Sequence, residues 1–64
     1  MTQITLLDGT KKNYRTTEND TYKFFMGSGV HGDMAELQQA LTLLGNKCTL
    51  DFDSVYGWFV RVKK

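Results

Sequence analysis

The chain contains no proline and only one cysteine among its 64 residues. Two common supports of small domains, a disulfide and a structural zinc site, are therefore missing. Cys48 cannot form a disulfide within the chain, and one cysteine with one histidine cannot complete a tetrahedral zinc site. We therefore predict no metal and no cofactor. A chain this short buries only about 60% of its unfolded surface. Good packing or association into a homodimer must supply its stability.

Neither sign of charge predominates, because eight Lys and Arg residues are balanced by seven Asp and Glu residues, for a net charge of +1. A large basic excess would suggest nucleic acid or an anionic membrane as partner, and a large acidic excess would suggest a DNA mimic. Long apolar runs are also absent, and the opening stretch MTQITLLDGTKK lacks the basic start and apolar core of a signal peptide. We therefore expect a cytoplasmic protein that does not associate with membranes.

What is present is the composition of a folded globular chain, with 41% hydrophobic, 12% aromatic and 23% charged residues. No repeat or low-complexity stretch divides it, so we predict a single domain over residues 1–64.

The N-terminal third predicts a β-hairpin, formed by QITLL and KKNYRTT around a turn at Asp8-Gly9. The second strand is polar, which is typical of a sheet edge. Two registers are open. A two-residue turn pairs Leu6 with Lys11, whereas a turn one residue longer, with a bulge, pairs Ile4 with Tyr14, and we prefer the second.

Three further stretches alternate in the manner of strands. In TYKFFM, one face holds Tyr22, Phe24 and Met26 and the other holds Lys23 and Phe25. KCTLDFD and WFVRVKK also alternate, and a loop over residues 54–56 would join them as a hairpin. That loop predicts three favourable cross-strand pairs: Phe52 with Trp58, Leu50 with Val60, and Cys48 with Val62.

A single helix is predicted over residues 34–44. Asp33 would be its N-cap, with Glu36 completing a capping box, and Gly45 followed by Asn46 would end it. Its apolar stripe consists of Met34, Leu37, Leu41 and Leu44. The element order ββ(β)αββ then predicts a small two-layer α+β domain, with an antiparallel sheet of four to five strands packed on one helix.

The glycines of GSGVHGD have the spacing of a dinucleotide-binding turn, and Asp51 follows about 20 residues later. That turn belongs to a parallel βαβ unit inside a larger sheet, which this chain lacks. We therefore interpret the stretch as a mobile connection to the helix. The alternative is an anion- or nucleotide-binding loop made of Gly27, Ser28, Gly29, His31 and Gly32.

Two residue combinations resemble sites of chemistry and are rejected. His31 and Cys48 are a conceivable base and nucleophile, but Cys48 alternates with apolar residues, which predicts a buried, inert thiol. Asp51-Phe52-Asp53 begins like a calcium loop but has Tyr56 and Val62 where glycine and glutamate are required. We therefore expect these two acids to be solvent-facing partners of Arg61 and Lys63, and we expect no enzyme.

The last strand carries Phe59, Arg61 and Lys63 on one face, which combines a stacking surface with cations, as in single-strand nucleic-acid binding. Asp51 and Asp53 on the same face oppose that field. A second basic cluster would extend the face if the two hairpins are neighbours; its members are Lys11, Lys12 and Arg15.

The chain has more aromatic residues than its small core requires, and aromatic and arginine residues favour the centres of protein interfaces. The first hypothesis is therefore a small accessory protein that binds another protein, a module or inhibitor of the kind that phages and mobile elements carry. Its predicted partner-binding residues are Phe59, Arg61, Lys63, Tyr56, Tyr14 and Phe25. A nucleic-acid-binding domain is the alternative, and a small-nucleotide binder is the second alternative.

Overall fold

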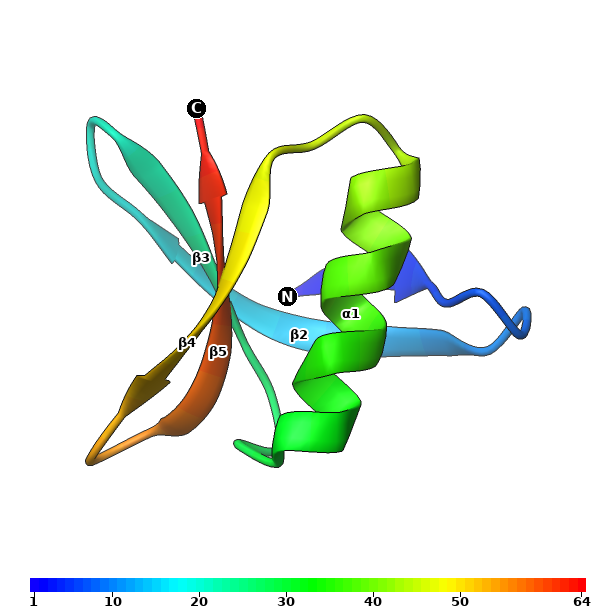
Figure 1. The fold of residues 1–64 in the computed structure, drawn as a ribbon, viewed down its shortest axis with the longest axis horizontal. Helices are drawn as coiled ribbons and strands as arrows, with labels where there is room; N and C mark the ends of the chain where they lie inside the picture. The colour runs from blue at the N-terminus through cyan, green and yellow to red at the C-terminus, as the bar shows by residue number, and fades with distance from the viewer.

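The computed structural model describes residues 1–64, which form five strands and one helix. In chain order these are β1 (Thr2–Thr5), β2 (Lys11–Glu18), β3 (Tyr22–Met26), α1 (His31–Leu43), β4 (Cys48–Asp53) and β5 (Gly57–Lys63). The strands make one antiparallel sheet in the order β1-β2-β3-β5-β4. The helix packs on one side of the sheet, mainly against β5 and β4 and also against β1, and no other helix or strand lies on the opposite side (Figure 1). The predicted α+β fold is confirmed.

The core lies between α1 and the sheet. The helix buries Met34, Leu37, Ala40 and Leu41. Against them lie Phe25, Val60, Val62 and Tyr14, with Ile4, Cys48, Leu50 and Trp58 at the margin of the cluster. Leu44 was predicted in the apolar stripe, but it is 69% exposed. It lies beyond the last helical residue, and Ala40 completes the buried stripe instead.

The helix begins three residues before the predicted start, and the predicted capping box is wrong. Val30 is the N-cap, and no side chain caps it. Asp33 lies inside the first turn, where its carboxylate accepts a hydrogen bond of 2.8 Å from the Ser28 hydroxyl. A negative charge there still favours the helix through its dipole.

The predicted C-terminal stop of the helix is confirmed. Gly45 has a φ of 92°, and its amide donates to the carbonyl of Thr42. The amide of Asn46 donates to the carbonyl of Leu41. These two bonds form a Schellman motif, which satisfies carbonyls that the end of the helix leaves free.

The hairpin of β4 and β5 has the predicted register: Cys48 pairs with Val62, Leu50 with Val60, and Phe52 with Trp58. Asp53 closes its loop, because one carboxylate oxygen accepts from the amides of Val55 and Tyr56 at 2.7 and 3.1 Å. Phe52 is nevertheless 58% exposed, since it lies beyond the region that α1 covers.

Both registers considered for the first hairpin are wrong, because Ile4 pairs with Lys12 and Thr2 with Tyr14. A type I′ turn needs positive φ at two residues, and here only Gly9 adopts it. The loop is therefore longer, and it turns Leu6 into the core. Asp8 steadies it, since the amide of Thr10 donates to its carboxylate at 2.9 Å and lowers the pKa of that carboxyl.

Candidate functional site

The side of the sheet turned away from α1 is hereafter the outer face. Alternation along the paired strands places these neighbouring side chains on it: Arg15, Thr17, Tyr22, Phe24, Met26, Thr49, Asp51, Asp53, Phe59, Arg61 and Lys63. The side chains that alternate with these on the same strands point to the other side of the sheet, and they include the core residues Phe25, Val60 and Val62. Phe59, Arg61 and Lys63 therefore share the face that the sequence predicted for them.

Aromatic rings form a continuous strip across the middle of the outer face. The ring centroids of Tyr22 and Phe24 are 6.1 Å apart, and those of Phe24 and Phe59 are 6.0 Å apart with the rings edge to face. The guanidinium of Arg61 lies 4.7 Å from the centroid of Tyr22, within cation–π range. These contacts pack the rings against one another and against Arg61.

A shallow groove of about 180 Å³ lies beside the strip, at the end nearest the loop between β4 and β5. Its lining residues are Thr17, Phe24, Met26, Asp53, Tyr56 and Phe59. Tyr56, predicted to be a partner-binding residue, is 59% exposed and forms one wall. A groove of this size matches one large apolar side chain and is too small to enclose an extended ligand.

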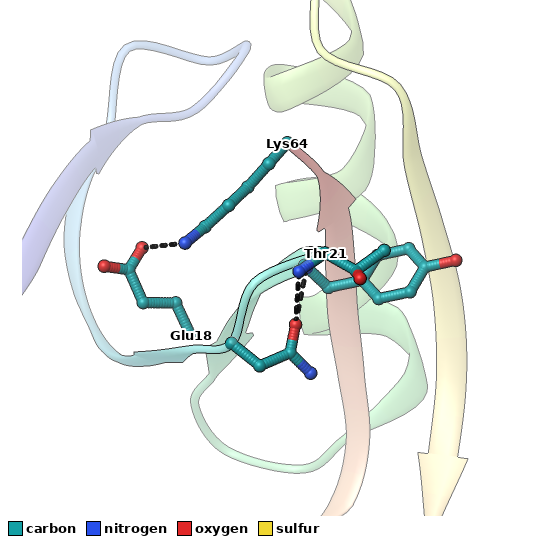
Figure 2. Close-up of polar contacts among 5 residues, drawn as sticks. Glu18, Thr21 and Lys64 are labelled. Atoms are coloured by element: carbon teal, nitrogen blue, oxygen red, sulfur yellow. Dashed lines mark hydrogen bonds and ion pairs between the residues drawn. The ribbon is translucent and has the colours of Figure 1, made fainter.

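Two ion pairs lie on or beside this face. Arg61 Nη1 lies 3.8 Å from Asp51 Oδ2, as expected for these strand neighbours. Lys64 Nζ lies 3.2 Å from Glu18 Oε2 (Figure 2). The same corner is tied by the amide of Lys64 to the carbonyl of Thr21, and by Asn19, whose side chain accepts from the amides of Thr21 and Tyr22. Lys63 has no acidic partner.

Two of the predicted partner-binding residues belong to the core instead. Tyr14 is 4% exposed and Phe25 is 5% exposed, so the prediction that they lie on the surface is wrong. The misleading signal for Phe25 was Lys23 on the same strand face. Lys23 is the second residue of β3, and its ammonium lies 5.4 Å from the centroid of Phe25. A lysine stem can cover an apolar ring in this way while its charged end stays near solvent.

Phe24 and Met26 take the place of Phe25 on the outer face. The alternation of TYKFFM already grouped them with Tyr22. Assigning Phe25 to the core would have placed this group on the outer face. Of the N-terminal basic cluster, Arg15 reaches this face beside Met26. Strand β3 lies between the two hairpins, so the predicted basic extension is separated from β5 by the aromatic strip.

The glycine-rich loop is a packing contact between two loops. Gly29 has a φ of 77°, and a Cβ there would lie 2.7 Å from the carbonyl oxygen of Tyr56. The amide of Trp58 donates to the carbonyl of Gly29 at 3.0 Å. Asp33 places its carboxylate beside Ser28, where an anion would have to approach. The nucleotide-binding alternative stays a prediction, and none of these contacts favours it.

His31 and Cys48 are not neighbours. The imidazole of His31 packs edge to face on Trp58, with centroids 4.7 Å apart, at the start of α1. The thiol of Cys48 contacts the carbonyl of Gln38 at 3.3 Å and the hydroxyl of Thr42 at 3.1 Å, near the other end of the helix. Nowhere do three or more His, Cys, Asp or Glu side chains gather in a way that could hold a metal ion.

No family model, curated protein or solved structure matches this chain. The helix α1 is not long or apolar enough to cross a membrane.

Proposed function

We propose that the protein acts by binding another protein through the outer face of its sheet. The observation that carries this proposal is the aromatic strip of Tyr22, Phe24 and Phe59, whose rings form a tilted and an edge-to-face pair on an uncovered sheet face bordered by charged residues. Protein interfaces have this arrangement, with rigid aromatic and arginine anchors at the centre and a polar rim around them.

Charge supports a protein partner over a nucleic acid. Single-stranded nucleic acid is held by aromatic stacking together with a groove of free cations. Here Arg61 is beside Asp51 and Lys64 is beside Glu18, so two of the last three basic side chains have acidic neighbours. The whole chain has a net charge of only +1.

Nucleic-acid binding is the second candidate, favoured by one observation. Arg15 and Lys63 carry cations on the outer face without an acidic partner, on either side of rings that could stack with bases. Such binding would depend on phosphate contacts and fall steeply with added salt.

On the proposed function, the protein is an accessory module or inhibitor without catalysis of its own, and it works in the cytoplasm. It changes or blocks the partner by occupying part of its surface. The side chains that do this are Phe24, Phe59 and Tyr56, with Arg61 and Lys63 setting orientation and association rate.

The test is affinity capture from host lysate with immobilised wild type, Phe59→Ala and Phe52→Ala. Phe52 is the matched control, since it is an exposed phenylalanine on the other face of the same hairpin. Removal of Phe59 should weaken capture by about 1 kcal/mol or more, a fivefold or greater effect. Phe52→Ala should capture like the wild type.

Two comparisons separate the candidates. Capture that survives nuclease treatment and moderate salt supports a protein partner. Binding of short single-stranded DNA or RNA that collapses at high salt, and disappears when Arg15, Arg61 and Lys63 are neutralised, would replace the proposal with the second candidate.

A further inference from the structure

Two rows of side chains cross the outer face, each contributed by the same four neighbouring strands. The backbone register pairs Arg15 with Met26, Met26 with Phe59, and Phe59 with Asp51, which makes the first row. The second row, one step further along the strands, contains Thr17, Phe24, Arg61 and Thr49. The first row thus begins with a guanidinium on β2, passes through an apolar centre and ends with a carboxylate on β4.

We propose that a second copy of this chain packs on the outer face, related by a two-fold axis parallel to the strands between β3 and β5. This inference rests on the proposed function, because it names one protein that the outer face binds. The two sheets would pack face to face, as in aligned β-sandwiches, where strand directions stay within about 30° of each other. Such an interface is isologous, so every contact occurs twice.

This axis places β2 of one copy over β4 of the other and β3 over β5. Each row therefore lies over the same row of the second copy, with its residues in the opposite order. Arg15 then faces Asp51 of the second copy, and Met26 faces Phe59 of the second copy. In the next row, Phe24 faces Arg61 of the second copy. These are an ion pair, a sulfur–aromatic contact and a cation–π contact, so the row order is complementary to its own reverse.

The other in-plane axis, running across the strands, would place β2 over β2. An axis through the first row would bring Arg15 of the two copies together and Asp51 of the two copies together, which is repulsive, and no axis in this direction places Arg15 over Asp51. Charge therefore selects the axis parallel to the strands.

The charged ends of the first row are available for this contact. Arg15 is exposed and has no acidic partner within its own chain. Asp51 Oδ1 accepts a hydrogen bond of 2.9 Å from the amide of Phe52, and Asp51 Oδ2 lies 3.8 Å from Arg61 Nη1, while the side chain is 47% exposed. The first row therefore presents an unpaired cation at one margin of the aromatic strip and a half-exposed carboxylate at the other.

The face is small, because it spans four strands about 4.8 Å apart. We therefore expect reversible association with a dissociation constant in the micromolar range, unlike the permanent dimers that large interfaces make. Self-association and capture of a different protein would use the same rings and compete with each other.

The experiment is sedimentation equilibrium of the purified full chain from low micromolar to millimolar concentration. The variants are Arg15→Glu, Asp51→Lys and their equimolar mixture, with Thr5→Lys as a control of surface charge away from the outer-face rows. Each single variant brings like charges together twice and should weaken dimerisation at least about tenfold. The mixture restores opposite charges at both contacts, so it should form a heterodimer close to wild-type strength.

A wild type that stays monomeric to millimolar concentration would overturn the inference whatever the variants do. A wild-type dimer whose stability is unchanged by Arg15→Glu and Asp51→Lys, or whose single variants do not recover on mixing, would also overturn it, since another surface would then carry the contact. A monomer that still captures a lysate protein through Phe59 refutes the homodimer and leaves the proposed function standing. Dimerisation that obeys the charge exchange supports the inference even when no lysate protein is captured.

Discussion

At the residue scale, Tyr14 illustrates how one side chain can serve packing at an electrostatic cost. Its ring lies under Gly27 and Met34, where a Cβ on Gly27 would be only 3.1 Å from the ring. Its hydroxyl is buried and has no hydrogen-bond partner. Burial, with a smaller contribution from Asp33 and Glu36, raises the pKa of this phenol above 10.0.

Tyr14→Phe should therefore leave stability at pH 7 unchanged or higher, because an unpaired buried hydroxyl costs about 1 to 3 kcal/mol. The raised pKa gives the pH dependence. The folded state favours the neutral phenol. The contribution of Tyr14 to the free energy of unfolding is therefore fully present below pH 10 and is lost as the pH rises above that value. The advantage of Tyr14→Phe over the wild type should widen above pH 10.

Urea denaturation at pH 7 and at pH 10.5 measures both effects. Tyr56→Phe is the control at pH 7, since it removes a hydroxyl from an exposed ring. A loss of more than about 1 kcal/mol at pH 7 in Tyr14→Phe would mean that the hydroxyl has a stabilising partner.

At the element scale, the contact of Gly29 with Gly57 positions the start of α1. Both residues have positive φ, and a Cβ on Gly57 would lie 2.8 Å from the carbonyl oxygen of Gly29. The loop before the helix is thereby held against the start of β5, and the hydrogen bond from the Trp58 amide to the Gly29 carbonyl fixes the position of the loop along the strand. This contact aligns the apolar stripe of α1 with the inner face of the sheet.

Gly29→Ala should destabilise the fold by about 1 to 3 kcal/mol, because it combines positive φ with a collision against backbone. Gly32→Ala makes the same chemical change inside the first turn of α1, where a Cβ meets nothing within 4 Å. It should be neutral or stabilising by about 0.5 to 1 kcal/mol. Thermal unfolding of both variants gives the comparison, and equal effects would show that the two loops are not in close contact.

At the scale of the whole molecule, one helix supplies the entire second layer. Only nine residues are buried, and four of them belong to α1. A core of this size supplies no more than about 3 to 5 kcal/mol of net stability. Any large change in the helical stripe therefore affects the fold as a unit.

Leu41→Ala should unfold or nearly unfold the protein, since removing a buried leucine side chain costs about 2 to 5 kcal/mol. Leu43→Ala is the matched control, because Leu43 is 73% exposed two residues further along the same helix. It should change stability by less than about 0.5 kcal/mol. Circular dichroism melting decides, and a cooperative transition in Leu41→Ala at the wild-type temperature would show that the helix does not pack as described.

The sequence was enough to predict those features that depend on residues close together in the chain. The stop at Gly45 and Asn46, the three pairs of the β4–β5 hairpin and the strip of apolar residues on α1 up to Leu41 all depend on neighbours in the sequence. On the outer face, the alternation of WFVRVKK alone grouped Phe59, Arg61 and Lys63.

The remaining features depend on which face of each strand meets the helix, and only the tertiary structure decides that. Periodicity separated Phe24 from Phe25 but could not say which one α1 would cover, because both faces of β3 carry a phenylalanine and Lys23 shares the face of Phe25. Tyr14 is buried since the helix start and Gly27 close over it, a contact between residues far apart in the chain. The sequence by itself therefore determined the elements and their periodicities, through short-range sterics and hydrogen bonding. Strand order and the packing of α1 decided which aromatic residues were left for the outer face.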